Sequence, residues 1–381
     1  MLLAQFCVIL FSMNKEFSER LQKIEGVLNT YLPAQSTDDW RALSFGAIDS
    51  CVSQAHLSNL LEPCKNLVDL GGKRWRPLLL VLCAELASSK KSEAEKIASL
   101  ENAYNITPLV EFAHTASLIH DDIEDCADTR RGKPAAHITY GLDVALNAGS
   151  WLYFEASSCI KNLKISDSEK LRLYELFLLE LRRLHLGQAM DILWHRNPEL
   201  IPSVSEYTAM VRNKTGTLSR LAVKLGVLAG GAGEQIVEKA GSFAQDIGTG
   251  FQIIDDVINL TTGNPGKKRG DDIVEGKKSL PVLIHLEKVP GDAPRLASLF
   301  SQARSEGIDS PAVEEAISIL TGSGAVDEAK ERGQKIIEEN SNLLAGLFGT
   351  SDSKAAGLIM ELFGALRGVP AERVAENAKR L

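Results

Sequence analysis

Apolar residues recur at helical spacing along almost the whole chain of 381 residues. Between Asn105 and Asp125 they advance in alternating steps of 3 and 4, and the stretch from Phe243 to Leu260 has similar spacing. Such steps place side chains on one helix face. Alternating apolar and polar runs rich in Val, Ile and Thr are missing, so no sheet is indicated. The pattern predicts an all-α fold.

The same periodicity predicts further helices between segments rich in Gly and Pro. They are expected over residues 15–32, 76–88, 142–163, 168–195, 204–228, 312–321, 324–347 and 352–366. No Pro/Gly/Ser linker is long enough to mark a domain border, and no fixed-period repeat is found. We therefore expect one domain of long helices over residues 13–381.

The first residues, MLLAQFCVILFSM, are apolar and contain no Lys or Arg. A secretory signal has a basic start, and a transmembrane helix needs about 20 apolar residues. We interpret residues 1–12 as an upstream extension, such as a misassigned start would add, with a weak membrane anchor as the alternative. No later segment is expected to span a bilayer.

Charge and cysteine content narrow the function further. Lys plus Arg total 42 and Asp plus Glu 50, a formal charge of −8 that argues against non-specific nucleic-acid binding. The six cysteines form no CxxC pair, so a zinc site or disulfide scaffold is not expected. A reducing cytoplasm is the simplest location.

Two predicted helices carry acidic motifs in strongly apolar surroundings. The first contains HDDIED, with Asp121 and Asp125 four residues apart, and the second contains DDVIN, with Asp255 and Asn259 at the same spacing. Residues four apart share a helix face. A single acidic run is usually a solvated helix face, but burying unpaired carboxylates is costly. Mg²⁺ relieves that cost and is often shared with substrate phosphates. The pair of motifs therefore suggests a cleft that binds a diphosphate through Mg²⁺.

Basic loops accompany both acidic motifs. The loop LGGKRWRP precedes the first motif, DTRRGKP follows it, and GKKRGDDIVEGKKSLP follows the second. Arg and Lys bind phosphate oxygens as a planar fork and a point charge, respectively. Each loop alone would be read as a solvated patch, whereas together they indicate an anionic substrate.

The motifs GGKRWRP, DDIED with its trailing RRGKP, LGQAMD, NKTG, FQIIDD and GDDIVEGKKSLP stand in this order over roughly residues 60–290. In residues, order and spacing, the chain resembles the trans-isoprenyl diphosphate synthase (polyprenyl synthetase) family. The resemblance implies a prenyltransferase with helices around a deep central cavity, usually a homodimer. It implies Mg²⁺ as cofactor and two substrates, isopentenyl diphosphate and an allylic diphosphate.

The resemblance also implies a role for each matching residue. Isopentenyl diphosphate would bind to Lys73, Arg76, His114 and Arg131. Mg²⁺ would bind between Asp121, Asp122 and Asp125 on one side and Asp255 and Asp256 on the other. The allylic diphosphate would contact Arg130, Lys214 and Lys267. Thr215 and Gln252 would support the developing cation, Lys277 would close the site, and Gln188 and Asp191 would line the wall.

Two positions bear on the product. Asn259 stands where many family members have Asp, so we expect weaker metal binding there, although its carbonyl oxygen is a potential ligand. Ala116 and Ser117, about one turn before the first motif, are small where short-chain relatives have aromatic residues. We therefore expect a product longer than fifteen carbons, with twenty favoured, that a Phe at either position shortens.

The expected chemistry needs no nucleophilic side chain. Mg²⁺, Lys and Arg stabilise the departing diphosphate, the isopentenyl double bond attacks the allylic cation, and an apolar cavity excludes water. Three alternatives remain: a class I terpene cyclase, a non-catalytic subunit of a prenyl synthase, and an HD-type phosphohydrolase. Chain growth by the purified protein would distinguish prenyl transfer from all three.

Overall fold

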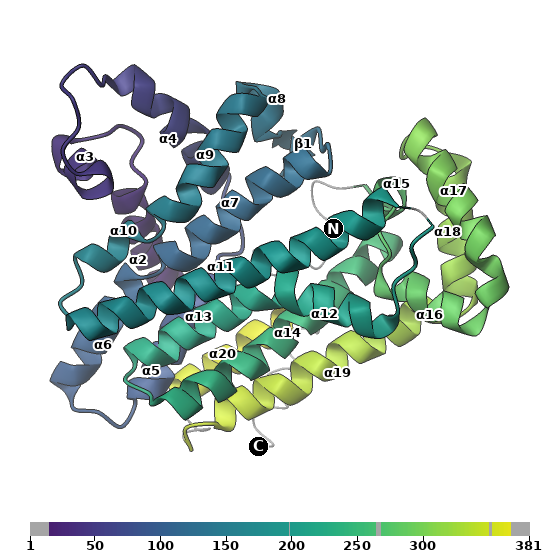
Figure 1. The fold of residues 1–381 in the computed structure, drawn as a ribbon. Coiled ribbons are helices and arrows are strands. Elements are labelled where there is room, and N and C mark those ends of the chain that lie inside the picture. Colours follow the sequence, from purple (N-terminus) through teal and green to yellow (C-terminus); the bar gives the residue numbers. More distant parts are fainter. Residues whose placement is uncertain (1–14, 198, 264–267, 350–352, 367–381) are drawn as a thin grey trace.

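The structure is a computed structural model that describes residues 15–197, 199–263, 268–349 and 353–366, and helices dominate it (Figure 1). The α-helices are α2 (Lys15–Tyr31), α3 (Asp38–Phe45), α4 (Gln54–Asp69), α5 (Trp75–Ser88), α6 (Glu93–Asn105), α7 (Pro108–Glu124), α8 (Ala136–Tyr140), α9 (Leu142–Glu155), α10 (Ser158–Lys161), α11 (Asp167–Arg196), α12 (Val204–Lys214), α13 (Gly216–Ala229), α14 (Glu234–Thr261), α15 (Asp271–Glu275), α16 (Leu280–Lys288), α17 (Ala293–Glu306), α18 (Pro311–Gly322), α19 (Ala325–Gly346) and α20 (Lys354–Leu366). The short elements are the 3₁₀ helix η1 (Pro290–Asp292) and the strands β1 (Thr129–Arg130) and β2 (Lys133–Pro134).

Local sequence explains where several helices begin. The hydroxyl oxygen of a serine just before the first turn accepts a hydrogen bond from the backbone N–H of the third helical residue. This third residue is a glutamate, and its carboxylate accepts a hydrogen bond from the backbone N–H of the serine. This capping box starts α6 at Ser92 and Glu95, α11 at Ser166 and Glu169, and α12 at Ser203 and Glu206. These reciprocal bonds satisfy backbone donors that would otherwise lack intrahelical partners.

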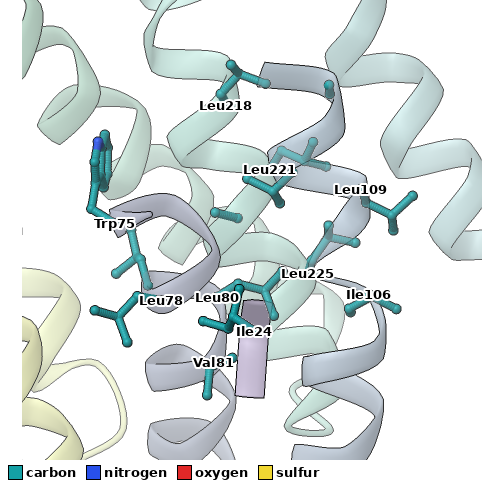
Figure 2. Packing of buried hydrophobic residues seen from close by; sticks show 14 of the residues in the cluster. Ile24, Trp75, Leu78, Leu80, Val81, Ile106, Leu109, Leu218, Leu221 and Leu225 are labelled. Carbon is teal, nitrogen blue, oxygen red and sulfur yellow. The ribbon is translucent and has the colours of Figure 1, made fainter. Parts of the chain in front are cut away.

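The main core forms where α5 packs against α13. Leu78, Leu80 and Val81 of α5 are fully buried, and Figure 2 shows them beside Leu221 and Leu225 of α13. Burying one such side chain contributes roughly 1.5–3 kcal/mol. Nearly every residue of α5 is buried, so this helix lies within the main core.

The second acidic motif lies on α14, one of the two longest helices. Figure 1 shows α11 running diagonally across the molecule, with α13 and α14 beside it. Along its length α14 packs against α13 and α19. Its Ile247 belongs to the main core, whereas its Val257 and Leu260 belong to a second core formed largely by α16, α17 and α18. The second acidic motif therefore lies where these cores meet.

The structure confirms the predicted all-α fold but corrects some boundaries. The helix expected over 142–163 ends at Glu155 and resumes as α10. The helix expected over 204–228 is interrupted at Thr215, whose hydroxyl turns to donate to Gln252 Oε1 (2.9 Å). Short-range periodicity does not reveal such a tertiary contact. Seven helices, α3, α4, α6, α8, α15, α16 and α17, were not predicted.

A small hairpin, β1–β2, was also not predicted. Thr129 pairs with Pro134 and Arg130 with Lys133, and the turn residues Arg131 and Gly132 have φ of 53° and 75°. Positive φ at both turn residues suits the twist of a two-residue hairpin. Strands of two residues are too short to show alternation in the sequence.

None of the helices within the described ranges combines the length and apolar composition needed to cross a bilayer. The extension predicted over residues 1–12 lies outside the described part of the chain, and the extent of the single domain stays a prediction.

Candidate active site

A cavity of about 1050 Å³ opens between α7, α11, α13 and α14 and collects most of the predicted site residues. Those that line it are Lys73, Arg76, His114, Ser117, Asp121, Arg130, Arg131, Lys214, Thr215, Gln252, Asp255, Asp256 and Lys277. Gln188 and Asp191 of α11 line it as well. Residues spread over some 200 positions of sequence are thus brought together.

Asp121, near the end of α7, faces cations across the cavity. Lys214 Nζ lies 3.0 Å from Asp121 Oδ1 and 2.6 Å from Asp191 Oδ2. Gln188 Nε2 donates to the same Asp121 oxygen at 3.1 Å. Burial alone would raise the pKa of Asp121, but Lys214, Lys277 and Arg130 outweigh it and hold the pKa far below its usual range. Asp121 is therefore ionised at neutral pH.

Asp122 points elsewhere. Its side chain is buried and is not among the cavity-lining groups, and Arg130 Nε donates to Asp122 Oδ1 at 2.7 Å. The next residue on the helix differs in direction by about 100°, which explains the separation from Asp121. Asp122 thus orients Arg130 of β1, and Arg130 lines the cavity.

Asp125, the C-cap residue of α7, faces Lys277, which lines the cavity. Its Oδ2 is 3.7 Å from Lys277 Nζ, and its Oδ1 is 3.5 Å from His195 Nδ1. Burial raises the pKa of Asp125, and the charges of Asp121 and Glu275 add to that effect. A cation close to this carboxylate is needed to keep it ionised.

The second acidic motif on α14 has two different carboxylates. Asp255 lines the cavity, while Asp256 accepts hydrogen bonds from Tyr207 Oη (2.7 Å) and Gln252 Nε2 (2.9 Å). Burial raises the pKa of Asp256. The two hydrogen bonds lower it, but burial has the larger effect. Gln252 also accepts from Thr215, so the predicted Thr215–Gln252 pair is joined directly.

Another part of the wall is basic. Lys73 Nζ lies 5.7 Å from the centre of the Phe251 ring, and Arg76 stacks over Trp75 at 4.5 Å. Arg76 Nη1 is 3.4 Å from His114 Nε2. Burial and the charge of Arg76 lower the pKa of His114 to about 4, so its ring is neutral at pH 7. It can present a hydrogen-bond donor there without adding charge.

Arg131 approaches this basic wall across a glycine. A Cβ on Gly72 would lie 3.0 Å from Arg131 Nη2, and Gly72 has φ of 156°. The second glycine of GGKRWRP therefore allows the arginine to pass close to the loop. Arg131 Nη1 also donates to Leu67 O at 3.1 Å.

Two residues hold this loop: Arg74, which sequence reasoning counted only among the loop cations, and Glu111, which it missed. Arg74 has φ of 45° and donates to Glu25 Oε1 (2.7 Å) and Glu111 Oε1 (2.6 Å). Glu111 is buried three residues before His114, and its Oε1 lies 3.8 Å from His114 Nδ1. A glutamate on an apolar helix face one turn before the histidine was the available signal.

The chain-length positions differ from each other. Ser117 lines the cavity and donates to His114 O at 2.7 Å, whereas Ala116 is fully buried and does not line it. The cavity also contains an aromatic group that was not identified from the sequence. The Tyr153 ring lies 5.5 Å from His120 and 5.2 Å from His185, between α7 and α11, and all three line the cavity.

The fit of these residues to a metal ion follows from their chemistry. Within the described ranges, no three His, Cys, Asp or Glu side chains are grouped closely enough to hold a metal by themselves. Mg²⁺ does not need such a cage, because it binds through one or two carboxylates together with phosphates and waters. Asp121 and Asp255 line the same cavity and supply these oxygens. Lys267, predicted to bind the allylic diphosphate, lies outside the described residues.

Fold and site define an all-helical enzyme of the isoprenoid synthase fold. The structure resembles that of geranylgeranyl pyrophosphate synthetase from Pyrococcus horikoshii, with a TM-score of 0.72, 27% identity, and coverage of 96% of this chain and 98% of the other. The family model described as polyprenyl synthetase matches residues 58–319. The chain belongs to the polyprenyl synthetase family.

Two characterised relatives agree with this assignment. Geranylgeranyl diphosphate synthase of Methanosarcina mazei is 33% identical over 301 residues, covering 78% of this chain and 87% of the relative. Geranylfarnesyl diphosphate synthase of Aeropyrum pernix is 33% identical over 286 residues, covering 74% and 85%. The predicted family, fold class and enzyme class are confirmed, and the chain is a prenyltransferase.

Proposed function

We propose that this prenyltransferase joins isopentenyl diphosphate to an allylic diphosphate and releases a trans-prenyl diphosphate of twenty carbons. The observation that carries the proposal is the cavity itself, where the acidic faces of α7 and α14 meet basic residues from separate loops. The relatives named geranylgeranyl diphosphate synthase support the twenty-carbon product.

The basic wall would bind the diphosphate of isopentenyl diphosphate. Lys73, Arg76 and Arg131 supply positive charge, and neutral His114 supplies a hydrogen bond. Arginine suits phosphate oxygens because its guanidinium presents several donors in one plane. Glu111 holds Arg74, and with it the loop that carries Lys73 and Arg76.

The acidic faces would bind Mg²⁺ and, through it, the allylic diphosphate. Asp121 and Asp125 of the first motif and Asp255 of the second are the residues that would hold the ion. Bound Mg²⁺ would stabilise negative charge on the departing diphosphate. Lys214 and Lys277 now lie close to Asp121 and Asp125, so they are placed to turn toward a diphosphate when the ion neutralises these carboxylates.

The reaction requires that water be kept from the allylic cation. Leu118, Leu184 and Leu218 line the cavity and provide apolar surface for the prenyl chain. The isopentenyl double bond forms the new carbon–carbon bond, the allylic carbon–oxygen bond breaks, and the released diphosphate takes the proton that the product loses. Thr215 and Gln252 place oxygen dipoles beside the developing positive charge.

A second copy of the chain is the proposed partner. Large apolar side chains are exposed along α9 and α11, namely Leu142, Leu146, Phe154, Leu171, Leu178, Leu186 and Leu193. Large apolar side chains exposed in this number along two helices are typical of an interaction site. We propose that this face forms a homodimer. Cytoplasmic location stays a prediction from the sequence.

The direct test is incubation of the purified protein with isopentenyl diphosphate, Mg²⁺ and one of three allylic diphosphates of five, ten or fifteen carbons. After dephosphorylation, chromatography of the alcohols should show a twenty-carbon product. Asp121→Asn should abolish it, whereas Asp39→Asn, a change of an exposed aspartate on α3, should not. Cyclic hydrocarbons formed without isopentenyl diphosphate would favour the terpene cyclase alternative, and no product would favour a non-catalytic subunit.

A further inference from the structure

Asn259 of α14 is bonded at two atoms to the segment that starts α15. Its backbone oxygen accepts from Gly270 N at 2.9 Å, and its side-chain Oδ1 accepts from Asp272 N at 3.3 Å. Asn259 is 1% exposed and lines the cavity. Asp272 lies in the first turn of α15, where backbone N–H groups lack intrahelical partners. One residue thus ties this turn to α14.

These bonds also determine which way the Asn259 amide faces. A backbone N–H can only donate, so the atom opposite Asp272 N is the amide oxygen. The Nδ2 group must then point away from Asp272, and it is buried without an acceptor among the described residues. A buried donor without a partner is costly, which indicates that a ligand satisfies it. An NH₂ group suits a phosphate oxygen and repels a metal ion.

The α15 segment is connected to the first acidic motif. Lys277 N donates to Asp272 O at 2.9 Å, and Lys277 Nζ lies 3.7 Å from both Asp272 Oδ1 and Asp125 Oδ2. Arg304 Nη2 donates to Glu275 O at 2.6 Å and holds the other end of α15. The position of Asn259 therefore influences where Lys277 meets the carboxylates of α7.

We propose that Asn259 is a positioning residue that clamps α15 to α14 and presents its NH₂ group to a diphosphate oxygen, and that it is not a metal ligand. This proposal replaces the expectation that Asn259 is a weak metal ligand, because its side-chain oxygen already accepts the hydrogen bond from Asp272 N. The diphosphate contact rests on the proposed function, whereas the clamp does not.

Hydrogen exchange tests the clamp without substrate. In Asn259→Leu the Asp272 amide should exchange about tenfold faster than in the unmodified protein, since its acceptor is lost. In Asn259→Asp a carboxylate oxygen replaces the acceptor, so exchange should stay within about threefold. Asn340→Leu is the matched control, because the Asn340 side chain donates to Ile336 O of its own helix, α19, at 2.9 Å. Unchanged exchange at Asp272 in Asn259→Leu would overturn the clamp.

Calorimetry with pyrophosphate in saturating Mg²⁺ tests the donor. Asn259→Asp removes the NH₂ group, so pyrophosphate should bind about tenfold more weakly although α15 stays clamped. If Asn259 were a metal ligand, the added negative charge would strengthen binding instead, and that result would overturn the donor assignment. Failure of the unmodified protein to bind pyrophosphate would count against the proposed function, and it would leave the exchange result standing.

Discussion

At the scale of single residues, the candidate site is a set of carboxylates held by the protein's own cations. Lys214 bridges Asp121 and Asp191, and Lys277 lies near Asp125. Such pairing removes much of the cost of burying charge before a ligand arrives. In the proposed reaction, a metal ion and a diphosphate would exchange partners with these groups and leave no new buried charge uncompensated.

Phe substitutions at the two chain-length positions should have different effects. Ser117→Phe places an aromatic ring in the cavity and should shorten the product, as chromatography of the dephosphorylated alcohols would show. Ala116→Phe inserts the same ring into a fully buried position and should lower the free energy of unfolding by about 1–3 kcal/mol. From the sequence, both substitutions were expected to shorten the product. An unchanged product length in Ser117→Phe would show that the cavity floor lies elsewhere.

Glu155 predicts a pH dependence of stability. It is buried at the end of α9, where it accepts from Ser44 Oγ (2.8 Å) and Ser158 Oγ (2.9 Å), and burial raises its pKa from 4.5 to about 7. Between these values the folded protein retains a proton that the unfolded chain has lost. The contribution of Glu155 to stability is therefore full below pH 4.5, falls as pH rises, and levels off above pH 7.

Glu155→Gln measures this contribution, because a glutamine oxygen can accept the same two bonds. Urea unfolding should show equal stability of the two proteins near pH 4.5. At pH 8 the variant should be more stable by about 3 kcal/mol, the free energy that corresponds to raising the pKa of Glu155 from 4.5 to about 7. A stability difference that does not change with pH would contradict the buried, protonated state of Glu155.

At the scale of elements, the site depends on close helix crossings. α11 crosses the end of α12 at Gly187, where an added Cβ would lie 2.2 Å from the backbone nitrogen of Lys214. Backbone cannot yield as a flexible side chain can. The glycine in LGQAMD thus sets the distance from Gln188 and Asp191 to Lys214.

Gly187→Ala should therefore separate α11 from α12 and displace Lys214. We expect a loss of about 1–3 kcal/mol in stability and a fall in kcat/KM of at least tenfold. Gly26→Ala on α2 is the matched control, since its Cβ would meet nothing within 4 Å. That change should leave activity unaltered and raise helix stability slightly. Equal activity of the two variants would contradict the role given to this crossing.

The sequence predicted the long helices, and most of the site residues that it predicted line the cavity, because periodicity and motif order are local properties. It did not separate Asp122 from Asp121, since the direction of each depends on how α7 is rotated against its neighbours. Arg74 was grouped with the other loop cations, yet it is bonded to Glu25 and Glu111. That distinction depends on contacts between residues far apart in the chain.

At the scale of the whole molecule, the exposed apolar face of α9 and α11 predicts self-association. Leu186→Glu places a charge on this face, where the leucine is 55% exposed, and should shift a dimer toward monomer in analytical ultracentrifugation. Leu343→Glu changes a leucine of α19 that is 52% exposed and should not alter the mass. A monomeric unmodified protein, or equal masses for both variants, would contradict the proposed face.

The measurement that tests the account most directly is a crystal structure with pyrophosphate and Mn²⁺ bound, in which anomalous scattering locates the metal. We predict metal ions against Asp121 and Asp125 on one side and Asp255 on the other, with Lys214 and Lys277 turned to the pyrophosphate. Metal and pyrophosphate bound outside this cavity, with both lysines still on the carboxylates, would contradict the account.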